Sequence, residues 1–263
     1  MTMSAPEQQT WLVKAASVAG GGHRRAGRAC QDAHCWRRLP GGWLVAAVAD
    51  GAGSARLAER GAVAAARFAA QWLAEQAHRF PPPGQETRWR ALLLEALENA
   101  RLAVEAEAAE LAASISDLAT TLALLVASPR QLAAIQIGDG AIVNSDAEGR
   151  LLALTVPRRG EYCNETFFLH SAGALERAQI RVWTGAPDCL AMMTDGVQAL
   201  ALNQPGSLPH GPFFEPLWHF ARQPLPAAEG DARLRAFLES DRLAARVDDD
   251  LTLLLASLNP AAA

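Results

Sequence analysis

The sequence predicts an α+β fold in which β-sheets pack together and are covered by helices. Short apolar runs typical of strands lie towards both ends of the chain, and two long segments with helical spacing lie between them. Elements that are apolar on one face must bury that face against another layer. The 263 residues suffice for one sizeable core. Without a repeat or a linker, we predict a single domain over residues 1–263, with its core at about 11–258.

The N-terminal half holds two expected strands followed by two expected helices. The runs WLVKAASVAG (11–20) and GGWLVAAVAD (41–50) indicate strands, the second apolar on both faces. The stretch between them is Gly-rich and irregular at its start. Apolar residues then recur at helical spacing from Ser54 to about His78, and again over 87–114.

The C-terminal half is expected to consist mainly of strands. Apolar runs over 118–155, separated by Ser-Pro, Gly-Asp-Gly and Glu-Gly turns, are typical of an antiparallel meander. Further strands are expected at ETFFLHS (165–171), AQIRVWTG (178–185), DCLAMMTDG (188–196) and DLTLLLASL (250–258). A Pro-rich insertion (207–220) and a late helix (231–244) complete the prediction.

Composition excludes several classes of function. The net charge of -4 and the absence of a basic block argue against a nucleic-acid partner. No apolar stretch reaches the roughly 18 residues that a membrane span needs, and MTMSAPEQQT lacks the features of a signal peptide. The four cysteines form no CxxC pair, which favours reduced thiols over a zinc site. We therefore expect a soluble, cytoplasmic protein without a membrane partner.

Acidic residues stand directly beside core-type runs at four places. Asp50, Asp139 and Asp195 follow such runs, and the acids 248–250 precede one. Each alone could be a turn residue. Together they suggest carboxylates that converge at strand ends, where only a hard cation would relieve their repulsion. Ligands that are all oxygen suit Mg²⁺ or Mn²⁺, and two such ions would activate a water molecule and clamp a phosphoryl group.

Five motifs occur in the order and spacing of a known family: VADGAGS, TTLALLV, IGDGAIV, MMTDGVQAL and DDDLTLLLA. They resemble the metal-dependent (PPM, or type 2C) serine/threonine protein phosphatases over residues 17–258. GGGHRRAGRACQDAH and GEYCNETFFL are similar to a bacterial branch of it. The resemblance implies a four-layer α-β-β-α sandwich of two antiparallel sheets flanked by helices. It also implies Mn²⁺- or Mg²⁺-dependent hydrolysis of phosphoserine and phosphothreonine by a metal-activated water.

The resemblance further implies the ligands of a dinuclear metal centre. Asp50 would bridge both ions, and the backbone carbonyl of Gly51 would bind one of them. Asp195 and Asp249 would complete the shell of the other ion. Asp248 would replace Asp249 only if the register were shifted by one residue.

Two further acids are implied at this centre. Asp139 would hold a third, weaker metal ion together with Asp195. Asp32 matches an acid that holds bound water near the metals. The predicted catalytic set is therefore Asp50, Asp195, Asp249 and Asp32.

The chain departs from the family at three positions. Gly27 stands where many members have the arginine that grips the substrate phosphate, so His23 or Arg28 is expected to bind it instead. The alternative is that His23 is a loop histidine that contacts nothing. Ala52 stands where animal members have a histidine that is a proposed general acid. Gln31 replaces a family glutamate, which predicts a more hydrated and weaker second metal site.

The remaining polar residues near these motifs have simpler interpretations. Thr120 and Thr121 are expected to pack beneath the site, and Ser54 is expected to cap the helix that follows it. Asn164 and Thr166 are candidates for a flap that faces the substrate.

The main hypothesis is thus a protein serine/threonine phosphatase. Its expected partners are a phosphorylated protein substrate and a cognate serine/threonine kinase. A second hypothesis, motivated by Gly27, Gln31 and Ala52, is a catalytically weak or inactive domain that binds and regulates a kinase or phosphoprotein. A third is a metal-dependent hydrolase of small phosphate esters, because the sequence defines no substrate groove.

Overall fold

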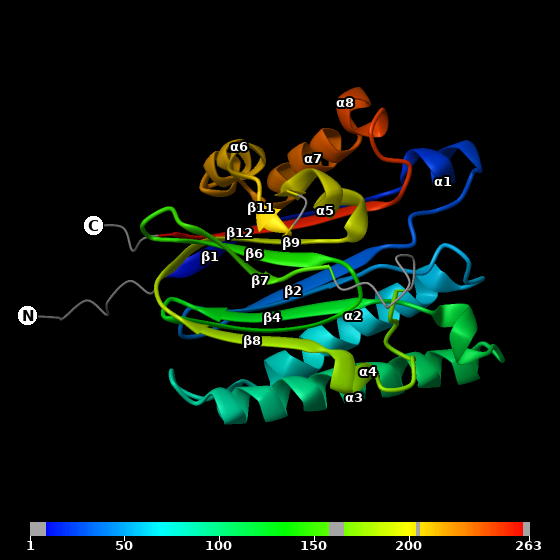
Figure 1. Cartoon of the computed structure of the whole chain (residues 1–263), viewed down its shortest axis with the longest axis horizontal. Coiled ribbons are helices and arrows are strands. Elements are labelled where there is room, and N and C mark those ends of the chain that lie inside the picture. Colours follow the sequence, from blue (N-terminus) through cyan, green and yellow to red (C-terminus); the bar gives the residue numbers. More distant parts are fainter. Residues whose placement is uncertain (1–8, 158–165, 204–205, 260–263) are drawn as a thin grey trace, which may run out of the picture.

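Two five-stranded antiparallel sheets lie face to face, and helices cover the outer side of each (Figure 1). This computed structural model describes residues 9–157, 166–203 and 206–259. In spatial order, the first sheet contains β1 (Thr10–Val18), β12 (Leu251–Asn259), β9 (Pro187–Met193), β6 (Ala141–Asp146) and β7 (Leu151–Thr155). The second contains β2 (Ala33–Leu39), β3 (Trp43–Ala49), β4 (Leu122–Ser128), β5 (Gln131–Ile137) and β8 (Gln179–Thr184). The expected four-layer sandwich is confirmed.

Helices form the two outer layers. The helices are α1 (Gly21–Arg25), α2 (Ala58–Glu75), α3 (Glu86–Glu110), α4 (Ala174–Arg177), α5 (Asp195–Ala201), α6 (Gly211–Ala221), α7 (Ala227–Leu238) and α8 (Asp241–Ala244). Short 3-10 turns occupy Ala77–Arg79 and Ile115–Leu118, and two short strands, β10 (Leu202–Asn203) and β11 (Leu208–Pro209), pair with each other. Helices α2 and α3 pack on the second sheet, whereas α5, α6 and α7 pack on the first. None of the described helices combines the length and hydropathy that a membrane span requires.

Strand β3 shows why its sequence is apolar throughout. Val45 and Ala47 face the core between the second sheet and α2–α3. Leu44 and Ala46 face the core between the two sheets, together with Leu254 of β12. Both faces of β3 are therefore buried, as the continuous apolar run predicted.

Helix α2 begins later than the sequence predicted. It starts at Ala58, with Leu57 as its N-cap, so the expectation that Ser54 caps this helix is wrong. The residues just before α2 are hydrogen-bonded to the segment that precedes β4: the Leu57 N–H donates to the Asp117 carbonyl at 2.8 Å. This tertiary hydrogen bond satisfies a backbone donor that an earlier helix start would have used.

The predicted meander over 118–155 is wrong at one connection. Strands β4 and β5 form a hairpin, as do β6 and β7, but β5 and β6 belong to different sheets. The chain changes sheet at Gly138 and Gly140. A Cβ on Gly138, whose φ is +109°, would lie 2.5 Å from Thr121 Cγ2, and one on Gly140 would lie 2.6 Å from the Met193 carbonyl oxygen. Contact with both sheets therefore holds this connection at the end of the sandwich.

Three other segments differ from the prediction. Residues 166–168 have no regular secondary structure and residues 169–171 form a turn and a bend, in place of the expected strand; residue 165 lies outside the described part of the chain. The Pro-rich insertion contains α6, with Pro212 in its first turn and Pro216 within it. The stretch after residue 20 contains α1 and β2, because β2 pairs with β3 along its whole length. The secondary structure of these three segments depends on backbone pairing and packing, which local composition does not reveal.

Candidate metal centre

Three aspartates converge at one end of the sandwich. Asp50 follows β3, Asp139 lies between β5 and β6, and Asp195 is the first residue of α5 after β9. One carboxylate oxygen from each lies within 4.8 Å of those from the other two. The antiparallel order of the strands and the change of sheet at Asp139 bring these distant residues to the same edge.

The backbone of Asp50 is held from beneath by two threonines. Its N–H donates to Thr121 Oγ1 at 3.0 Å. Its carbonyl accepts hydrogen bonds from Thr120 Oγ1 at 3.0 Å and from the Thr121 N–H at 2.8 Å. Both threonines are buried. They therefore occupy the supporting position predicted for them.

The electrostatics of this cluster disfavour three ionised carboxylates without a cation. Burial raises the pKa of Asp50 well above 3.8, and the charges of Asp32 and Asp195 add to the shift. Burial also raises the pKa of Asp195 to about 6, with contributions from the charges of Asp139 and Asp249. A bound divalent cation would reverse this balance because it favours the ionised forms of its ligands.

The donor set fits such a cation. Asp195 Oδ1 is buried and has no hydrogen-bond partner within the described part of the chain. A buried carboxylate oxygen without a partner is unfavourable unless a ligand occupies its lone pairs. The converging ligand atoms are all carboxylate oxygens, the type preferred by Mg²⁺ and Mn²⁺.

The acids before β12 have three different environments. Asp248 is 75% exposed and accepts a hydrogen bond from Arg25 on the surface at 2.8 Å. Asp249 lies outside the group of three converging aspartates, yet its charge raises the pKa of Asp195. Asp250 is buried. Of the three, Asp249 is thus the acid whose charge acts on the cluster while its carboxylate remains exposed.

Asp250 organises the loop that precedes β2, a role the sequence did not reveal. Its Oδ1 accepts hydrogen bonds from the Gly20 N–H at 2.7 Å and from His23 Nδ1 at 2.8 Å. Its Oδ2 accepts one from the Gln31 N–H at 2.6 Å. A single buried carboxylate thereby fixes both ends of the loop. The only signal in the sequence was the position of this acid directly before a buried strand.

The predicted phosphate-binding residues lie on this same segment, His23 within α1 and Arg28 just after it. Because His23 contacts Asp250, the alternative of a histidine without contacts is wrong. Gly27 has φ +65° and ends α1, with its N–H bonded to the Arg24 carbonyl and the next N–H, of Arg28, bonded to the His23 carbonyl. This is a Schellman C-cap, which favours glycine. Arg28 is exposed and lines a cavity of about 630 Å³.

Asp32 is buried next to the cluster. Thr194 Oγ1–H donates to Asp32 Oδ2 at 2.8 Å, and Thr194 Oγ1 in turn accepts a hydrogen bond from the Thr252 N–H at 3.0 Å. Burial raises the pKa of Asp32 to about 8, against the opposing hydrogen bonds of Thr194 and Thr252. The charge of Asp32 in turn raises the pKa of Asp50. The structure therefore brings this predicted residue to the site.

Three residues next to the aspartate cluster, Gly51, Ala52 and Thr166, pack against or bind its surroundings. A Cβ on Gly51 would lie 2.6 Å from the Gln31 carbonyl oxygen, so no larger residue fits there without movement. Ala52 is buried and its N–H donates to the Ala119 carbonyl at 2.9 Å. Thr166 Oγ1 donates to Asp139 Oδ2 at 2.8 Å, whereas Asn164, the other flap candidate, lies outside the described residues.

Comparison with known proteins agrees with this geometry. Residues 19–239 match the protein family described as Protein phosphatase 2C. Serine/threonine-protein phosphatase 3 of Escherichia coli (strain K12) is 35% identical over 260 residues, which cover 94% of this chain and 98% of that protein. The chain belongs to the protein phosphatase 2C family. It is a serine/threonine protein phosphatase, as its five motifs predicted.

Solved structures of other proteins share the fold seen here. Serine/threonine phosphatase Stp1 from Staphylococcus aureus has a TM-score of 0.63 at 12% identity, with 98% of both chains covered. The catalytic domain of serine threonine protein phosphatase PstP, in complex with two manganese ions, has a TM-score of 0.56 at 17% identity. That match covers 95% of this chain and 98% of PstP. RsbX in complex with magnesium has a TM-score of 0.54 at 16% identity, covering 98% of this chain and all of RsbX.

Proposed function

We propose that this phosphatase requires Mn²⁺ or Mg²⁺ and hydrolyses phosphoserine and phosphothreonine in proteins. The observation that carries the proposal is the convergence of Asp50, Asp139 and Asp195 around a buried, unpartnered oxygen of Asp195. Asp249 and the backbone carbonyl of Gly51 would complete the ligands of two ions. Asp139 and Asp195 would serve a third, weaker one. The manganese ions of PstP and the magnesium of RsbX support this choice of metal.

When bound, two such ions would lower the pKa of a water molecule and offset the charge on the phosphoryl oxygens. The protein contributes by holding its ligands before substrate arrives. Thr120 and Thr121 fix the backbone of Asp50. Asp32 is held by Thr194 at the same edge, where it would orient water. Ala52 offers no proton to the leaving alkoxide, so that proton would come from water.

His23 and Arg28 would bind the substrate phosphate in place of the arginine that many relatives have at position 27. Asp250 engages His23 at Nδ1, which leaves Nε2 for a second partner. Arg28 projects from the end of the same loop into a cavity that Gln31 and Gly53 also line. Guanidinium groups suit phosphate because they donate two parallel hydrogen bonds.

The substrates would be phosphoproteins, with a serine/threonine kinase as the enzyme that supplies them. The proposed location is the cytoplasm. The three described cysteines, Cys30, Cys35 and Cys189, are free thiols, as is usual in a reducing compartment.

The adjacent acids before β12 provide a matched test of the metal ligands. Hydrolysis of p-nitrophenyl phosphate and of a phosphothreonine peptide is measured against Mn²⁺ concentration for wild type, Asp195→Asn, Asp249→Asn and Asp248→Asn. Loss of a residue that merely supports a ligand costs about 10–100-fold, so loss of a ligand should cost about a hundredfold or more at low Mn²⁺. Asp248→Asn should behave as wild type because Asp248 is exposed and paired with Arg25.

The other outcomes separate the competing functions. Folded wild-type protein without Mn²⁺-dependent turnover would favour a domain that binds a kinase or phosphoprotein and regulates it. Turnover of p-nitrophenyl phosphate without turnover of the peptide would favour a hydrolase of small phosphate esters. Equal loss in Asp248→Asn and Asp249→Asn would contradict the assignment of Asp249 as the ligand.

A further inference from the structure

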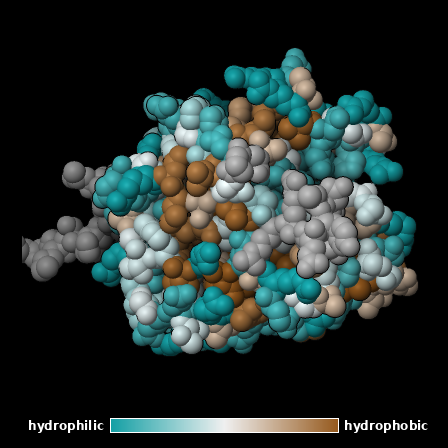
Figure 2. Space-filling model, in the orientation of Figure 1, coloured by the Kyte–Doolittle hydropathy of each residue, from teal (hydrophilic) through white to brown (hydrophobic). Residues whose placement is uncertain are grey.

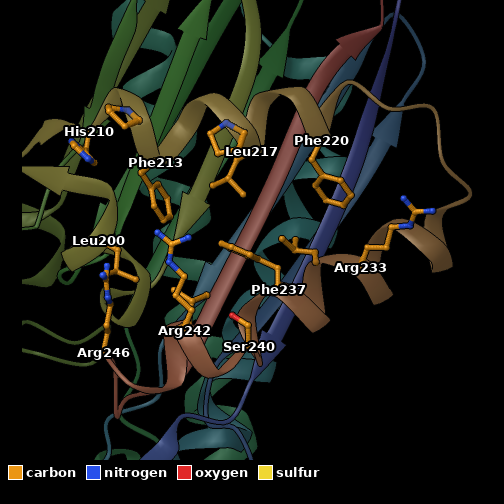
Figure 3. A pocket seen from close by; sticks show the side chains of 14 residues that line it. Leu200, His210, Phe213, Leu217, Phe220, Arg233, Phe237, Ser240, Arg242 and Arg246 are labelled. Carbon is orange, nitrogen blue, oxygen red and sulfur yellow. The ribbon is translucent and has the colours of Figure 1, made fainter.

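A cavity of about 610 Å³ lies on the outer side of the first sheet, among α5, α6, α7 and α8 (Figure 3). None of the residues proposed for the metal centre lines it. Its walls are mainly apolar and include Phe213, Leu217 and Phe220 of α6 and Leu234 and Phe237 of α7. Cavities of this size and composition are typical of sites for small ligands.

The apolar walls come from two facing helices. Phe213, Leu217 and Phe220 lie at positions i, i+4 and i+7 of α6, which places them on one face of that helix. Phe237 of α7 faces them across the cavity (Figure 3) and is 38% exposed. Figure 2 shows hydrophobic residues gathered in the part of the surface where Figure 1 places α6, α7 and α8. Solvent therefore reaches an apolar surface here, and a ligand that covered it would be favoured.

The polar lining of the cavity is basic. His210, Arg242 and Arg246 lie towards one end of it (Figure 3), and no Asp or Glu lines it. The chain as a whole has a net charge of -4, so this local charge is opposite to that of the whole molecule. Within the described residues, neither Arg242 nor Arg246 has a carboxylate within 4.0 Å, whereas Arg25, Arg150 and Arg222 each form an ion pair.

The opposite end of the cavity carries no comparable charge. Arg233 lies there (Figure 3), but its guanidinium is paired with Glu229 of the same helix at 2.6 Å. The cavity therefore has one positively charged end and one apolar, locally neutral end. This polarity matches a molecule with an anionic head and an apolar body.

We propose that this cavity binds a small amphiphilic anion, that is, a carboxylate, sulfonate or phosphate with an aliphatic or aromatic body. The anionic group would meet Arg242 and Arg246, which donate hydrogen bonds to such groups in pairs. The body would lie between the phenylalanines of α6 and Phe237 of α7. The volume suits a single small ligand, and the charge at only one end suits a single head group.

Dodecanoate, kept below its micelle concentration, is a direct probe of this site. Calorimetric titration of the full chain should show saturable binding of one dodecanoate per protein. Dodecyltrimethylammonium has an alkyl chain of nearly the same length with the opposite charge and should bind much more weakly. The variant Arg242→Glu/Arg246→Glu should weaken dodecanoate binding about tenfold or more, because it removes two attractions and adds repulsion.

Two further variants locate the effect. Arg90→Glu changes an exposed arginine on α3, in the opposite outer layer, and should leave dodecanoate affinity unchanged. Phe237→Ala removes only an exposed apolar side chain and should weaken dodecanoate binding without unfolding the protein. If the double variant does not fold, the dodecanoate affinity of Phe237→Ala tests the proposal. Absent or non-saturable binding, equal binding of the cation, or unchanged affinity in both cavity variants would overturn the proposal. Binding of an acidic amphipathic peptide but not of dodecanoate would overturn it in favour of a protein partner.

Discussion

The metal centre and the basic cavity are constructed in opposite ways. The candidate metal centre brings together Asp50, Asp139 and Asp195, three acids that are far apart in the sequence and that each follow a buried strand. The cavity draws on one stretch, from Leu200 to Arg246, and its walls are helices. The two regions are nevertheless neighbours along the chain. Helix α5 begins at Asp195 and includes Leu200, and Arg246 precedes Asp249 by three residues.

This contrast shows which region lowers the stability of the folded protein. The three converging aspartates are partly buried and close to one another, which disfavours the folded protein until a cation binds. Arg242 and Arg246 of the cavity are exposed, so water solvates them at little cost. We therefore expect changes near the metal centre to have large effects and changes near the helices to have smaller ones.

The largest expected effect is a dependence of stability on pH in the metal-free protein. Burial raises the pKa of Asp195 from 3.8 to about 6 and that of Asp32 to about 8. The stability that such groups contribute is fully present below pH 3.8, their unfolded-state pKa, and is lost as the pH rises through their folded-state pKa values. Urea unfolding in EDTA should therefore show the free energy of unfolding falling between about pH 4 and pH 8.

Added Mn²⁺ should recover most of that loss at the upper end of the range, because it binds the ionised carboxylates of the folded state. Asp195→Asn should reduce the slope in EDTA, whereas Asp248→Asn should not. Identical pH profiles with and without Mn²⁺ would count against a metal site at these acids.

The next largest effect is expected from Asp250→Ala. The substitution leaves the N–H groups of Gly20 and Gln31 without their acceptor and releases His23. We expect the free energy of unfolding to fall by about 3 kcal/mol, measured by urea denaturation. Asp248→Ala, which removes only the exposed pair with Arg25, is the matched control and should change little. A similar loss in both variants would contradict the organising role of Asp250.

A moderate effect is expected on the helical side from Lys14→Met. The Lys14 ammonium is buried beneath α6 and donates to the carbonyls of Ala221 at 2.8 Å and Gln223 at 2.9 Å. Removing it leaves these helix-end carbonyls without a donor and should lower the free energy of unfolding by about 2 kcal/mol. Mn²⁺-dependent activity per folded molecule should be unchanged. Loss of activity without loss of stability would show that the two regions are coupled.

The smallest effect is expected from Gly27→Ala. Gly27 has φ +65°, which disfavours any side chain, and alanine should lower the free energy of unfolding by about 1 kcal/mol. Gly53→Ala is a suitable control because Gly53 also has open space around it but lacks a positive φ. Equal thermal stability of the two variants would indicate that the cap at Gly27 is dispensable.

Much of the fold and the acids of the candidate site could be predicted from local pattern. The doubly buried strand ending at Asp50 was visible because both faces of β3 are apolar. The change of sheet at Gly138 was not, since a Gly-Asp-Gly turn also suits a hairpin. Helix α6 was missed because its prolines suggested irregular structure, although Pro212 occupies the first turn, where its missing N–H is harmless.

The sequence by itself determined which residues are buried, because apolar periodicity dictates which faces leave water, and it determined that acids stand at strand ends. Only the tertiary structure decided which of those acids meet. Asp139 reaches Asp50 and Asp195 because the chain changes sheet beside it, and Asp250 turns away to hold a loop. The structure also decided where Arg242 and Arg246 lie. A cavity with apolar walls and basic residues at one end forms only when separate helices pack side by side. The spacing of residues along the sequence does not reveal how close those helices come to one another.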